Sequence, residues 1–589
     1  MKRDISKLLF ALGLALIMVP QSALTQNMSE TTKRVINEAR RTNPALRVNM
    51  DPQTGMPTRI RGLRPIVDPA ISLGASRDAS GAPSEADIRK SVEAFFSTGE
   101  LSAAFAARNP RTKVLSTKVR KDPDIPTQSV VHVEQRVDGI PVFGSSARVI
   151  VGPSLAVTQL SANFSSVAIE NTTPSITKDQ AIETTRSKLG KILNEKHGDK
   201  TLERLEREIN QVSAKATLVI FDPDLTRARG AKPGPTRLSW LTAIDDFRFF
   251  IDAQNGNVLF YYLDRRHAMP RRVYDLNQSF EFPGTEMIDE ASGLRLDALP
   301  EDAQKAFINA GNVRDFYAQV LGRETVLATG HEGNIESYVR YGDIKNAYWC
   351  VRKSSSCPTQ GVMVYGSNYA TALDIAGHEI THGIISEEAD LIYAKESGAV
   401  NEALADIFGT LIENQREPST SNWVIGEQLP GFSTTSPLRN LANPNLSDKD
   451  GNSLFDKTKP FSATNLGQPD HYDDFVLKDD PICETTSDFF NGCVHINSGI
   501  FNKFAFLIAE GGRHRGLVVK GIGLPKLERI AYRALTTQLT ESSGMIDSAE
   551  GFWASCAELA QAQVAGITSS DCDKVRQAQT AVGLFRAGS

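Results

Sequence analysis

Residues 374–383 read DIAGHEITHG, a stretch with two histidines four positions apart and a glutamate directly after the first. The apolar residues around it recur with a helical period, which places Asp374, His378 and His382 on one side of the predicted helix. Histidines one turn apart can reach the same zinc ion, and Glu379 lies beside them, where a general base is needed. Two histidines leave a tetrahedral zinc ion short of protein ligands, so we expect a third ligand elsewhere in the chain.

A second predicted helix, SGAVNEALADIFGTLIEN at 397–414, carries three acids on one stripe. Glu402, Asp406 and Glu413 lie among alanine, leucine, isoleucine and phenylalanine, and burying three carboxylates is costly without cations or partners. We therefore assign Glu402 as the third zinc ligand and Asp406 as the acceptor of a hydrogen bond from a ligating histidine. Glu413 would then face Asp374, and two facing carboxylates indicate a calcium site.

The spacing around the second histidine separates the classes of zinc enzyme. Metzincins need glycine and histidine three and six positions later, where this chain has Ile385 and Glu388, so that class is excluded. Zinc aminopeptidases typically have one residue fewer than the nineteen between His382 and Glu402. They also need a glutamate motif for the substrate amine, which the sequence does not show, so an aminopeptidase is the weaker alternative.

The length and composition of the chain indicate a soluble protein of several domains. With 589 residues it is too long for one hydrophobic core, and we expect three or four domains. A hydrophobic share of 40% and a charged share of 23% are ordinary for globular proteins. The net charge of -5 gives no indication of a nucleic-acid partner.

The N-terminus predicts export. Lys2, Arg3 and Lys7 precede LLFALGLALIMVP, an apolar run of about 13 residues that small and polar residues follow. A membrane-spanning helix needs roughly 20 apolar residues, so a cleaved signal peptide over residues 1–25 is favoured over a membrane anchor. We find no other segment apolar enough to span a membrane, and we expect a secreted, extracellular protein.

The six cysteines fit an exported protein. They fall into three neighbouring pairs, and pairing between neighbours is the simplest of the connectivities that six cysteines allow. The alternative is that they are free structural thiols. The expected bridges join Cys350 to Cys357, Cys483 to Cys493, and Cys556 to Cys572.

The first half of the chain reads as an α+β binding or folding module. Apolar and polar residues alternate around Asp138–Gly139 and Asn255–Gly256, which predicts two hairpins, and Thr177 is suited to cap a following helix. The basic segment at 264–275 suits either an ordinary linker or an exposed processing region near residues 265–272.

Several further motifs occur in one order and spacing. They are NAYW at 346–349, MVYG at 363–366, HEITHG at 378–383, LIYAKESGAVNEALADIFGTL at 391–411, PDHY at 469–472 and VHINSGIFNK at 494–503. By these motifs, the chain from about Val273 onward resembles the thermolysin-like neutral zinc metalloendopeptidases. The first half, with DGIPVFGSSARV and FFIDAQNGNVL, resembles the fungalysin/thermolysin-type propeptide of such precursors.

The resemblance implies an α+β multidomain precursor. Two α+β propeptide modules would precede a two-lobed catalytic domain, with a β-rich N-lobe, an α-helical C-lobe and the zinc cleft between them. The expected boundaries are residues 1–25 for the signal peptide, 26–165 and 166–268 for the propeptide modules, 269–370 for the N-lobe, and 371–589 for the zinc-site helix and helical C-lobe.

The resemblance also implies roles for individual residues. His378, His382 and Glu402 would hold one zinc ion, and Glu379 would assist the attack of a zinc-bound water on the peptide carbonyl. Tyr393 would help to stabilise the developing oxyanion. The residues that match substrate-binding positions are Asn346, Ala347, Arg439, Ile375, Ile425, Leu429 and Leu438. The pocket among them is apolar and branched, which predicts cleavage on the amino side of Leu, Phe, Ile or Val.

His495 matches the family's second donor to the oxyanion, but its surroundings depart from the family pattern. The aspartate that usually stands five residues before this histidine is Phe490 here, so Asp488 is the candidate to orient His495 instead. The helix that follows is expected to be capped near Asn497 or Ser498.

The calcium site of the family is only partly kept. Acids remain at Asp374, Glu413 and Glu427, and fewer charges favour one calcium ion over two. The other three acids are replaced by Asn422, Val424 and Gln428. An insertion at 443–460 resembles a calcium loop through Asp448, Asp450, Asn452 and Asp456, but it lacks the full EF-hand pattern and can equally be a polar turn.

We therefore expect a secreted, zinc-dependent endopeptidase that is made as an inactive precursor. Its partners would be protein and peptide substrates and its own propeptide, which would assist folding and inhibit the protease. The protein is expected to be a monomer that binds neither nucleic acid nor membranes. The alternative is an exported peptide-binding protein with a decayed protease site, which Phe490 keeps open.

Overall fold

The structure is a computed structural model that describes residues 30–585 with gaps. The gaps lie at 44–45, 51–56, 62, 64–82, 99–110, 123, 126, 166–168, 198–213, 226–233, 245–246, 264–270, 290–295, 324–334, 351–353, 355, 360, 421 and 448–449. The expected signal peptide and most of the expected processing region lie outside the described residues. Within the described ranges, no helix is both long and apolar enough to cross a bilayer.

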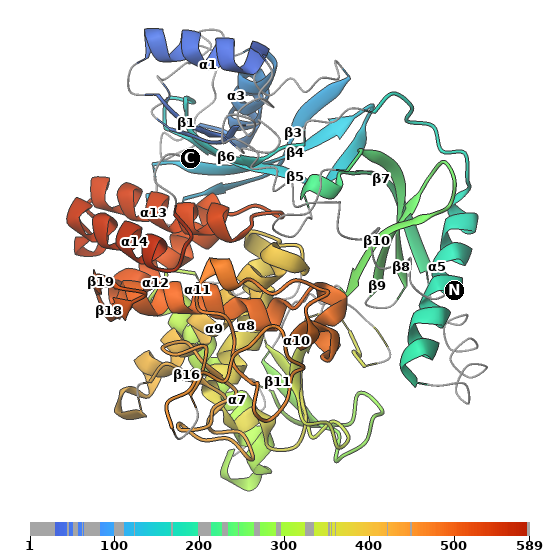
Figure 1. Ribbon diagram of the computed structural model, residues 1–589, viewed down its shortest axis with the longest axis vertical. Coiled ribbons are helices and arrows are strands. Elements are labelled where there is room, and N and C mark those ends of the chain that lie inside the picture. The colour runs from blue at the N-terminus through green and yellow to red at the C-terminus, as the bar shows by residue number, and fades with distance from the viewer. Residues whose placement is uncertain are drawn as a thin grey trace, which may run out of the picture.

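A ten-stranded sheet runs through the N-terminal extension (Figure 1). Its order is β1-β2-β6-β5-β7-β8-β9-β10, and β4 pairs with both β3 and β5. The strands are β1 (Arg47–Met50), β2 (Pro57–Arg61), β3 (Thr112–Lys121), β4 (Ser129–Val137), β5 (Ile140–Val151), β6 (Val157–Asn163), β7 (Ala214–Phe221), β8 (Arg237–Ile244), β9 (Phe247–Asp252) and β10 (Val258–Leu263). The pairs are antiparallel except β5 with β7, where Val142 pairs with Ile220. The sheet is therefore continuous across the boundary expected between the two propeptide modules.

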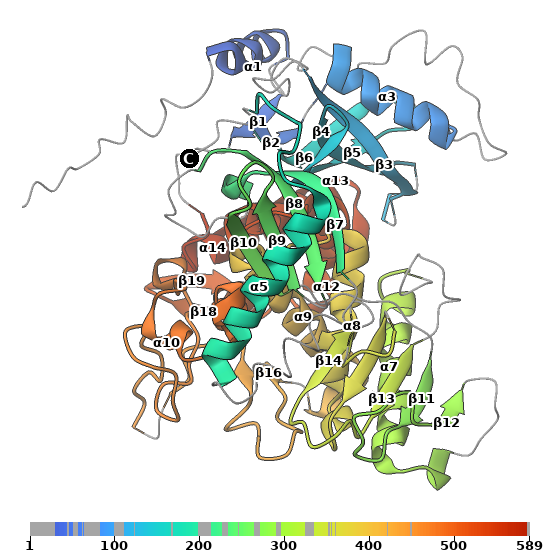
Figure 2. The same ribbon diagram turned by 90° about the vertical axis from the view of Figure 1, so that its right-hand side faces the viewer.

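Helices cover the sheet as the apolar pattern of the extension requires. α1 (Glu30–Thr42) and α3 (Glu85–Thr98) pack on the strands of the first expected module, and α5 (Lys178–His197) packs on β8 and β9 (Figure 2). Thr177 caps α5, because Gln180 N donates to Thr177 Oγ1 at 3.2 Å and Thr177 N donates to Gln180 Oε1 at 2.8 Å. Both predicted hairpins are confirmed at Asp138–Gly139 and Asn255–Gly256.

The C-terminal half begins with a five-stranded sheet against a long helix. The sheet has the order β12-β11-β13-β15-β14, so β14 is an edge strand. The elements are β11 (Arg272–Asp275), β12 (Thr285–Asp289), α7 (Glu301–Gln319), β13 (Glu336–Val339), β14 (Ala347–Cys350) and β15 (Val362–Tyr365). Phe316 and Tyr317 of α7 are fully buried in the core of this half.

Two buried helices, α8 (Leu373–Glu388) and α9 (Lys395–Arg416), form the centre of the C-terminal half. They cross where Gly377 faces Gly409: a Cβ atom on Gly409 would lie 2.5 Å from the carbonyl oxygen of Asp374. A larger residue at this crossing would push the helices apart. The glycine pair therefore sets the short distance across which side chains of α8 and α9 meet.

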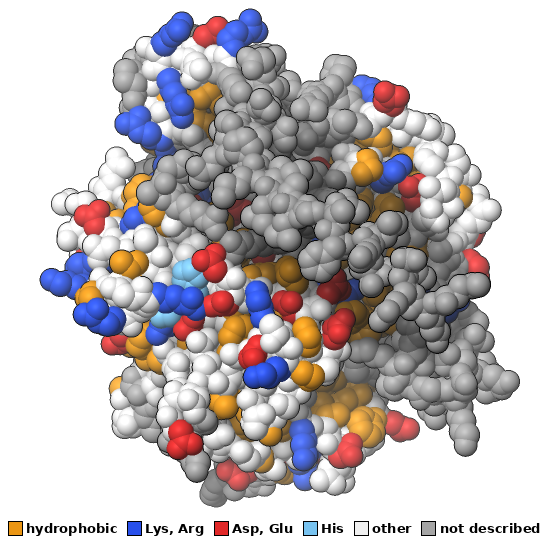
Figure 3. All heavy atoms as spheres, in the orientation of Figure 1, with side chains coloured by type: hydrophobic (Ala, Val, Ile, Leu, Met, Phe, Trp, Pro, Cys, Tyr) orange, Lys and Arg blue, Asp and Glu red, His pale blue; other side chains and the backbone are white. Residues whose placement is uncertain are grey.

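Further helices enclose this pair. They are α10 (Pro481–Glu484), α11 (Val494–Ala509), α12 (Leu524–Arg533), α13 (Met545–Gln561) and α14 (Ser569–Ala581), with small hairpins of β16 (Val424–Ile425) with β17 (Arg439–Asn440) and β18 (Gly511–His514) with β19 (Leu517–Lys520). The three expected disulfides are confirmed: Cys350–Cys357, Cys483–Cys493 and Cys556–Cys572. On the face shown in Figure 3, acidic and basic side chains are interspersed over the lower half of the molecule.

The N-terminal extension packs on the C-terminal half through buried ion pairs. Arg533 of α12 is 1% exposed and contacts Asp122 at 2.9 Å and Asp124 at 3.3 Å, both in the extension. Arg120 of β3 pairs with Glu388 at the end of α8. Loss of one partner of such a pair would leave the other charge buried and unpaired, which is costly.

Candidate active site

The predicted zinc set converges between α8 and α9. The Nε2 atoms of His378 and His382 lie 3.1 Å apart, and each lies 3.4 Å from a carboxylate oxygen of Glu402. All three side chains are buried. Among the residues that the structure describes, this is the group in which three possible ligands bring one donor atom each within 4.8 Å of one another.

These three residues fit a zinc ion. Glu402 Oε2 is buried and has no hydrogen-bond partner among the described residues, which is costly unless a cation completes it. Burial opposes a charge on His378, yet the hydrogen bond with Asp406 and the negative charges of Asp406 and Glu402 raise its pKa to about 10, so the site favours a positive charge. Burial lowers the pKa of His382 to about 4, which leaves this ring neutral and able to bind a metal.

Polar side chains contact the Nδ1 atoms of both histidines and so orient the two rings. His378 Nδ1 lies 2.8 Å from Asp406 Oδ1, and His382 Nδ1 lies 2.7 Å from Asn401 Oδ1. Asp406 in turn accepts hydrogen bonds from Arg439 Nη2 at 2.6 Å and Asn502 Nδ2 at 2.8 Å. The contact with Asp406 was expected from the sequence. Asn401 and Asn502 were missed, although Asn401 directly precedes Glu402 and therefore had a positional signal.

Glu379 lies next to this group and contacts the edge of the sheet. Its Oε2 atom accepts a hydrogen bond from the backbone nitrogen of Trp349 in β14 at 3.1 Å. Burial raises the pKa of Glu379 to about 7, and the nearby charge of His378 opposes that rise. A carboxylate with a pKa near neutrality can both take up and release a proton in that range.

Tyr393 and His495 approach the same carboxylate from the other side. The Tyr393 hydroxyl donates to Glu402 Oε1 and lies 3.3 Å from His495 Nε2, which is itself 3.4 Å from Glu402 Oε1. The side chain of His495 is 49% exposed, so it borders solvent, whereas Glu402 is 1% exposed. The Tyr393 hydroxyl and His495 Nε2 therefore lie together beside Glu402, and His495 borders solvent.

Asp488 contacts His495 in the way expected of an orienting residue. Its Oδ1 atom lies 2.9 Å from His495 Nδ1, and its Oδ2 atom accepts from the backbone nitrogen of His495 at 2.8 Å. Phe490 instead packs toward the N-terminal extension, with its ring 6.5 Å from that of Tyr261. The helix start expected near Asn497 or Ser498 was wrong: α11 begins at Val494, so His495 lies in its first turn.

The residues expected to bind substrate differ in burial and position. Asn346 precedes β14, and the buried Ala347 begins this edge strand of the sheet. Ile375, Ile425 and Leu429 are buried, and Leu438 is 40% exposed. The side chain of Arg439 is engaged with Asp406 and lies 3.4 Å from His378 Nδ1.

The acids expected to bind calcium form a second group, with Asp374 on α8, Glu413 on α9 and Glu427 after β16. Asp374 and Glu413 are fully buried, and burial raises the pKa of Asp374 to about 7 and that of Glu413 to about 9. Glu427 Oε2 is buried without a hydrogen-bond partner among the described residues, which fits a cation. However, Asn422 Nδ2 donates to Glu427 Oε1 at 2.7 Å, and Gln428 Nε2 donates to Glu413 Oε1 at 3.1 Å. Asp448 of the expected calcium loop lies outside the described residues.

This fold and this donor set point to one family of metallopeptidases. Residues 248–386 match the catalytic domain of thermolysin metallopeptidases, and residues 389–584 match their alpha-helical domain. The two matches together cover more than half of the chain, which belongs to the thermolysin metallopeptidase family. The predicted resemblance and fold class are thereby confirmed. The first match begins within β9, inside the second expected propeptide module, and the expected domain boundaries stay predictions.

Several relatives share this similarity. The chain is 34% identical to bacillolysin of Bacillus cereus over 330 residues, which are 55% of this chain and 51% of that protein. It is 34% identical to a thermolysin of Bacillus sp. (strain EA1) over 341 residues, 55% of this chain and 53% of that protein. Neutral protease B of Bacillus subtilis (strain 168) is 28% identical over 491 residues, 72% of this chain and 77% of that protein.

A solved structure is also similar. It is a precursor of protealysin, a metalloproteinase from Serratia proteamaculans, with 25% identity, a TM-score of 0.41, and coverage of 55% of this chain and 88% of that chain. The chain spans about half the length of the first two curated relatives.

Proposed function

We propose that the chain is a secreted zinc endopeptidase made as an inactive precursor. The observation that carries the proposal is the convergence of His378, His382 and Glu402, whose buried Oε2 atom accepts no hydrogen bond from the described residues, with Glu379 beside them. Two imidazoles, one carboxylate and a neighbouring base are the groups that hydrolysis of a peptide bond at zinc requires. A peptide-binding protein with a decayed site would need neither the base nor the two donors at Tyr393 and His495.

The side chains would have the following roles in the reaction. A zinc ion bound by this set supplies a Lewis acid that lowers the pKa of water and polarises the peptide carbonyl. Glu379 takes a proton from the attacking water and returns it to the leaving amine, a role suited to its pKa of about 7. Tyr393 and His495 donate hydrogen bonds to the carbonyl oxygen as negative charge develops on it. Asp488 holds the His495 ring by its Nδ1 atom, which leaves Nε2 facing the substrate.

The substrate would be an extended peptide that lies along the edge strand β14. Because β14 is the edge strand of its sheet, its outer edge could pair with such a chain as an added strand. Arg439 would bind the substrate carbonyl beyond the scissile bond. The apolar residues Ile375, Ile425, Leu429 and Leu438 would form the pocket that selects Leu, Phe, Ile or Val on the carboxyl side of the cleaved bond.

One calcium ion would stabilise the fold at Asp374, Glu413 and Glu427. The raised pKa values of Asp374 and Glu413 and the unmatched oxygen of Glu427 support a cation at this place. The amides of Asn422 and Gln428 already meet other oxygens of the group. One ion with few charges around it is therefore the occupancy that we propose.

The N-terminal extension would act as the propeptide and intramolecular chaperone of a monomeric enzyme. Its buried ion pairs with Arg533 and Glu388 support a tight, specific contact with the C-terminal half. Processing would occur near residues 265–272, between β10 and β11. The charged and apolar N-terminal sequence at residues 1–25 supports export.

Expression of the full chain tests this proposal directly. Wild type and Glu379→Gln are compared for cleavage near 265–272 by intact mass, with zinc content measured on both. We expect processing in wild type only, and hydrolysis of a Gly-Leu peptide by the mature wild type with zinc present. Equal yields of mature protein from both chains would overturn self-processing. A zinc-loaded mature wild type that leaves the Gly-Leu bond intact would overturn the peptidase assignment.

A further inference from the structure

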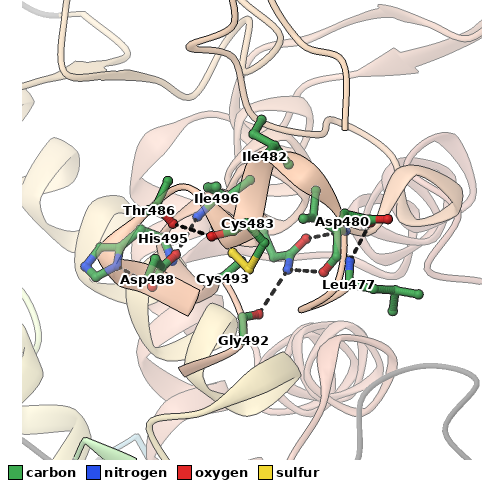
Figure 4. The surroundings of a disulfide bond; sticks show 12 residues. Leu477, Asp480, Ile482, Cys483, Thr486, Asp488, Gly492, Cys493, His495 and Ile496 are labelled. Atoms are coloured by element: carbon green, nitrogen blue, oxygen red, sulfur yellow. Dashed lines mark hydrogen bonds and ion pairs between the residues drawn. A yellow bond between two sulfur atoms is a disulfide. The ribbon is translucent and has the colours of Figure 1, made fainter. Parts of the chain in front are cut away.

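The proposed oxyanion donor His495 is held by a loop that a disulfide closes (Figure 4). Cys483 and Cys493 are both fully buried, and Asp488 lies between them in the turn η8 (Ser487–Asn491). Asp488 accepts from His495 Nδ1 at 2.9 Å and from the backbone nitrogens of His495 at 2.8 Å and Ile496 at 3.4 Å. The ring of His495 and the start of α11 thus depend on the position of one carboxylate.

The position of that carboxylate depends on both ends of the loop. Cys493 N donates to the carbonyl oxygen of Asp488 at 3.0 Å, and Thr486 N donates to that of Cys483 at 3.0 Å. The two cysteines belong to a small apolar cluster that is separate from the main core of the C-terminal half. The other members of this cluster are Val476, Ile482 and Ile496, with Phe455 packed against them. The bridge therefore joins the two ends of the loop that carries Asp488.

The outer face of η8 contacts the N-terminal extension. The ring of Phe490 lies 6.5 Å from that of Tyr261 in β10. Lys478 Nζ lies 5.8 Å from the Tyr261 ring and 4.3 Å from the Phe489 ring. In the precursor, the turn is thus supported from outside by the extension and from inside by the bridge. Removal of the extension leaves the bridge as the inner support.

We propose that the Cys483–Cys493 disulfide positions His495, through Asp488, in the mature enzyme. Cys483 and Cys493 are then positioning residues of the peptidase, and this inference rests on the proposed function. Asp488 takes the place of the aspartate expected at the position of Phe490, and the bridge closes the loop that carries Asp488. Loss of the bridge should lower turnover of the mature enzyme while the zinc ligands and the substrate pocket stay in place.

The test compares two double variants of the full chain. Cys483→Ser/Cys493→Ser removes the proposed positioning bridge, and Cys556→Ser/Cys572→Ser removes a control bridge between α13 and α14. The two bridges span 10 and 16 residues, so the loops they close are of comparable size. We expect both variants to be processed near 265–272 and to bind one zinc ion. The first should lose roughly 10- to 100-fold in kcat with KM within about twofold of wild type, because a misplacement of about 1 Å can cost that much, and the control should keep the wild-type kcat.

Three further measurements separate positioning from a general loosening of the fold. In a His495→Ala background, removal of the Cys483–Cys493 bridge should cause no further loss of kcat, because the group to be positioned is gone. The backbone amides of His495 and Ile496, which donate to Asp488, should exchange hydrogen faster in the mature double serine variant than in its precursor. Asp488→Asn, with the bridge intact, should reproduce the loss of kcat.

Each contrary result has one meaning. Equal losses in the two double variants, a further loss in the His495→Ala background, or a wild-type kcat for Asp488→Asn would overturn the positioning role. A double serine variant that fails to accumulate leaves the decision to Asp488→Asn and to the exchange of the His495 amide in it. A mature wild type without peptidase activity would instead overturn the proposed function. Amide exchange would then still decide whether the bridge holds the loop against α11.

Discussion

The zinc set and the calcium group differ in the partners that satisfy their carboxylates. In the zinc set, Glu402 Oε2 has no hydrogen-bond partner among the described residues, and positive charge is favoured on His378. In the calcium group, amides of Asn422 and Gln428 already donate to the acids. In the zinc set, a cation is therefore needed to satisfy the buried carboxylate. In the calcium group, neutral amide donors already satisfy part of the carboxylate oxygens. The consequence is that zinc should be required for function, whereas calcium should tune stability.

Removal of one acid from each group should give the largest contrast. Glu402→Gln takes away a ligand, so we expect loss of bound zinc and a fall in kcat/KM of more than about 1,000-fold. Glu413→Gln should keep zinc and most of the activity, because it lies in the other group. Metal analysis and peptide hydrolysis on the mature proteins measure both. Wild-type zinc occupancy in Glu402→Gln would contradict the distinction.

The hydrogen bond behind His382 should matter next. Asn401→Ala removes the acceptor 2.7 Å from His382 Nδ1, and loss of such an orienting partner typically lowers metal affinity about 10- to 100-fold. Asn414→Ala is the matched control, since Asn414 lies on the same helix and donates to Thr410 and Asn422 instead. Competition with a chromogenic zinc chelator gives the two affinities. Equal affinities would show that His382 needs no support from Asn401.

The pH dependence of stability should reveal the calcium group. Burial raises the pKa of Glu413 to about 9 and that of Asp374 to about 7, so without calcium the folded state binds more protons than the unfolded state between about pH 4 and 9. Stability should therefore fall as the pH rises through this window, by about 2–4 °C in unfolding temperature per kcal/mol. Thermal unfolding of zinc-loaded protein at pH 5 and pH 8 tests this. Added calcium should remove most of the fall, and an unchanged fall would argue against calcium at these acids.

Restoring two acids to the calcium group should raise its affinity for calcium. Of the variants compared, this one should change peptidase activity least. Asn422→Asp/Gln428→Glu replaces two amide donors by carboxylates, so we expect roughly 10-fold tighter calcium binding and a lower unfolding temperature when calcium is absent. Peptidase activity should change less than twofold. Gln561→Glu, at the exposed end of α13, controls for added charge. Calcium titration calorimetry measures the affinity, and an unaltered affinity would mean that the amides do not replace ligands.

Helical spacing accounts for the part of the site that the sequence predicts. His378, His382, Glu402 and Asp406 recur in steps of one turn, and a helix converts that spacing into a shared face whatever the tertiary context. The apolar neighbours of Glu402 signal burial in the same way. These local rules also predict the hairpins at Asp138–Gly139 and Asn255–Gly256 and the pairing of neighbouring cysteines.

Local sequence rules do not predict the backbone geometry that supports His495. It depends on the start of α11 at Val494, where Cys493 adopts a left-handed conformation with φ of 61° that is uncommon outside glycine and asparagine. The sequence pattern also does not predict the contact of Asn502 with Asp406, because only the packing of α11 on α9 brings the two residues together. Contacts between separate helices carry no periodic signal in the sequence.

Because Arg533 is buried among acids of the extension, cutting the chain would not by itself release the extension. This arginine is held by Asp122 and Asp124 of the extension and by Glu558 of α13, at a place with almost no access to water. A cut near residues 265–272 breaks one peptide bond and leaves these pairs intact. The nicked protein should therefore migrate as a single particle in size-exclusion chromatography while it shows two bands in a denaturing gel. If the proposed processing occurs, degradation of the extension would set the moment at which the C-terminal half becomes free.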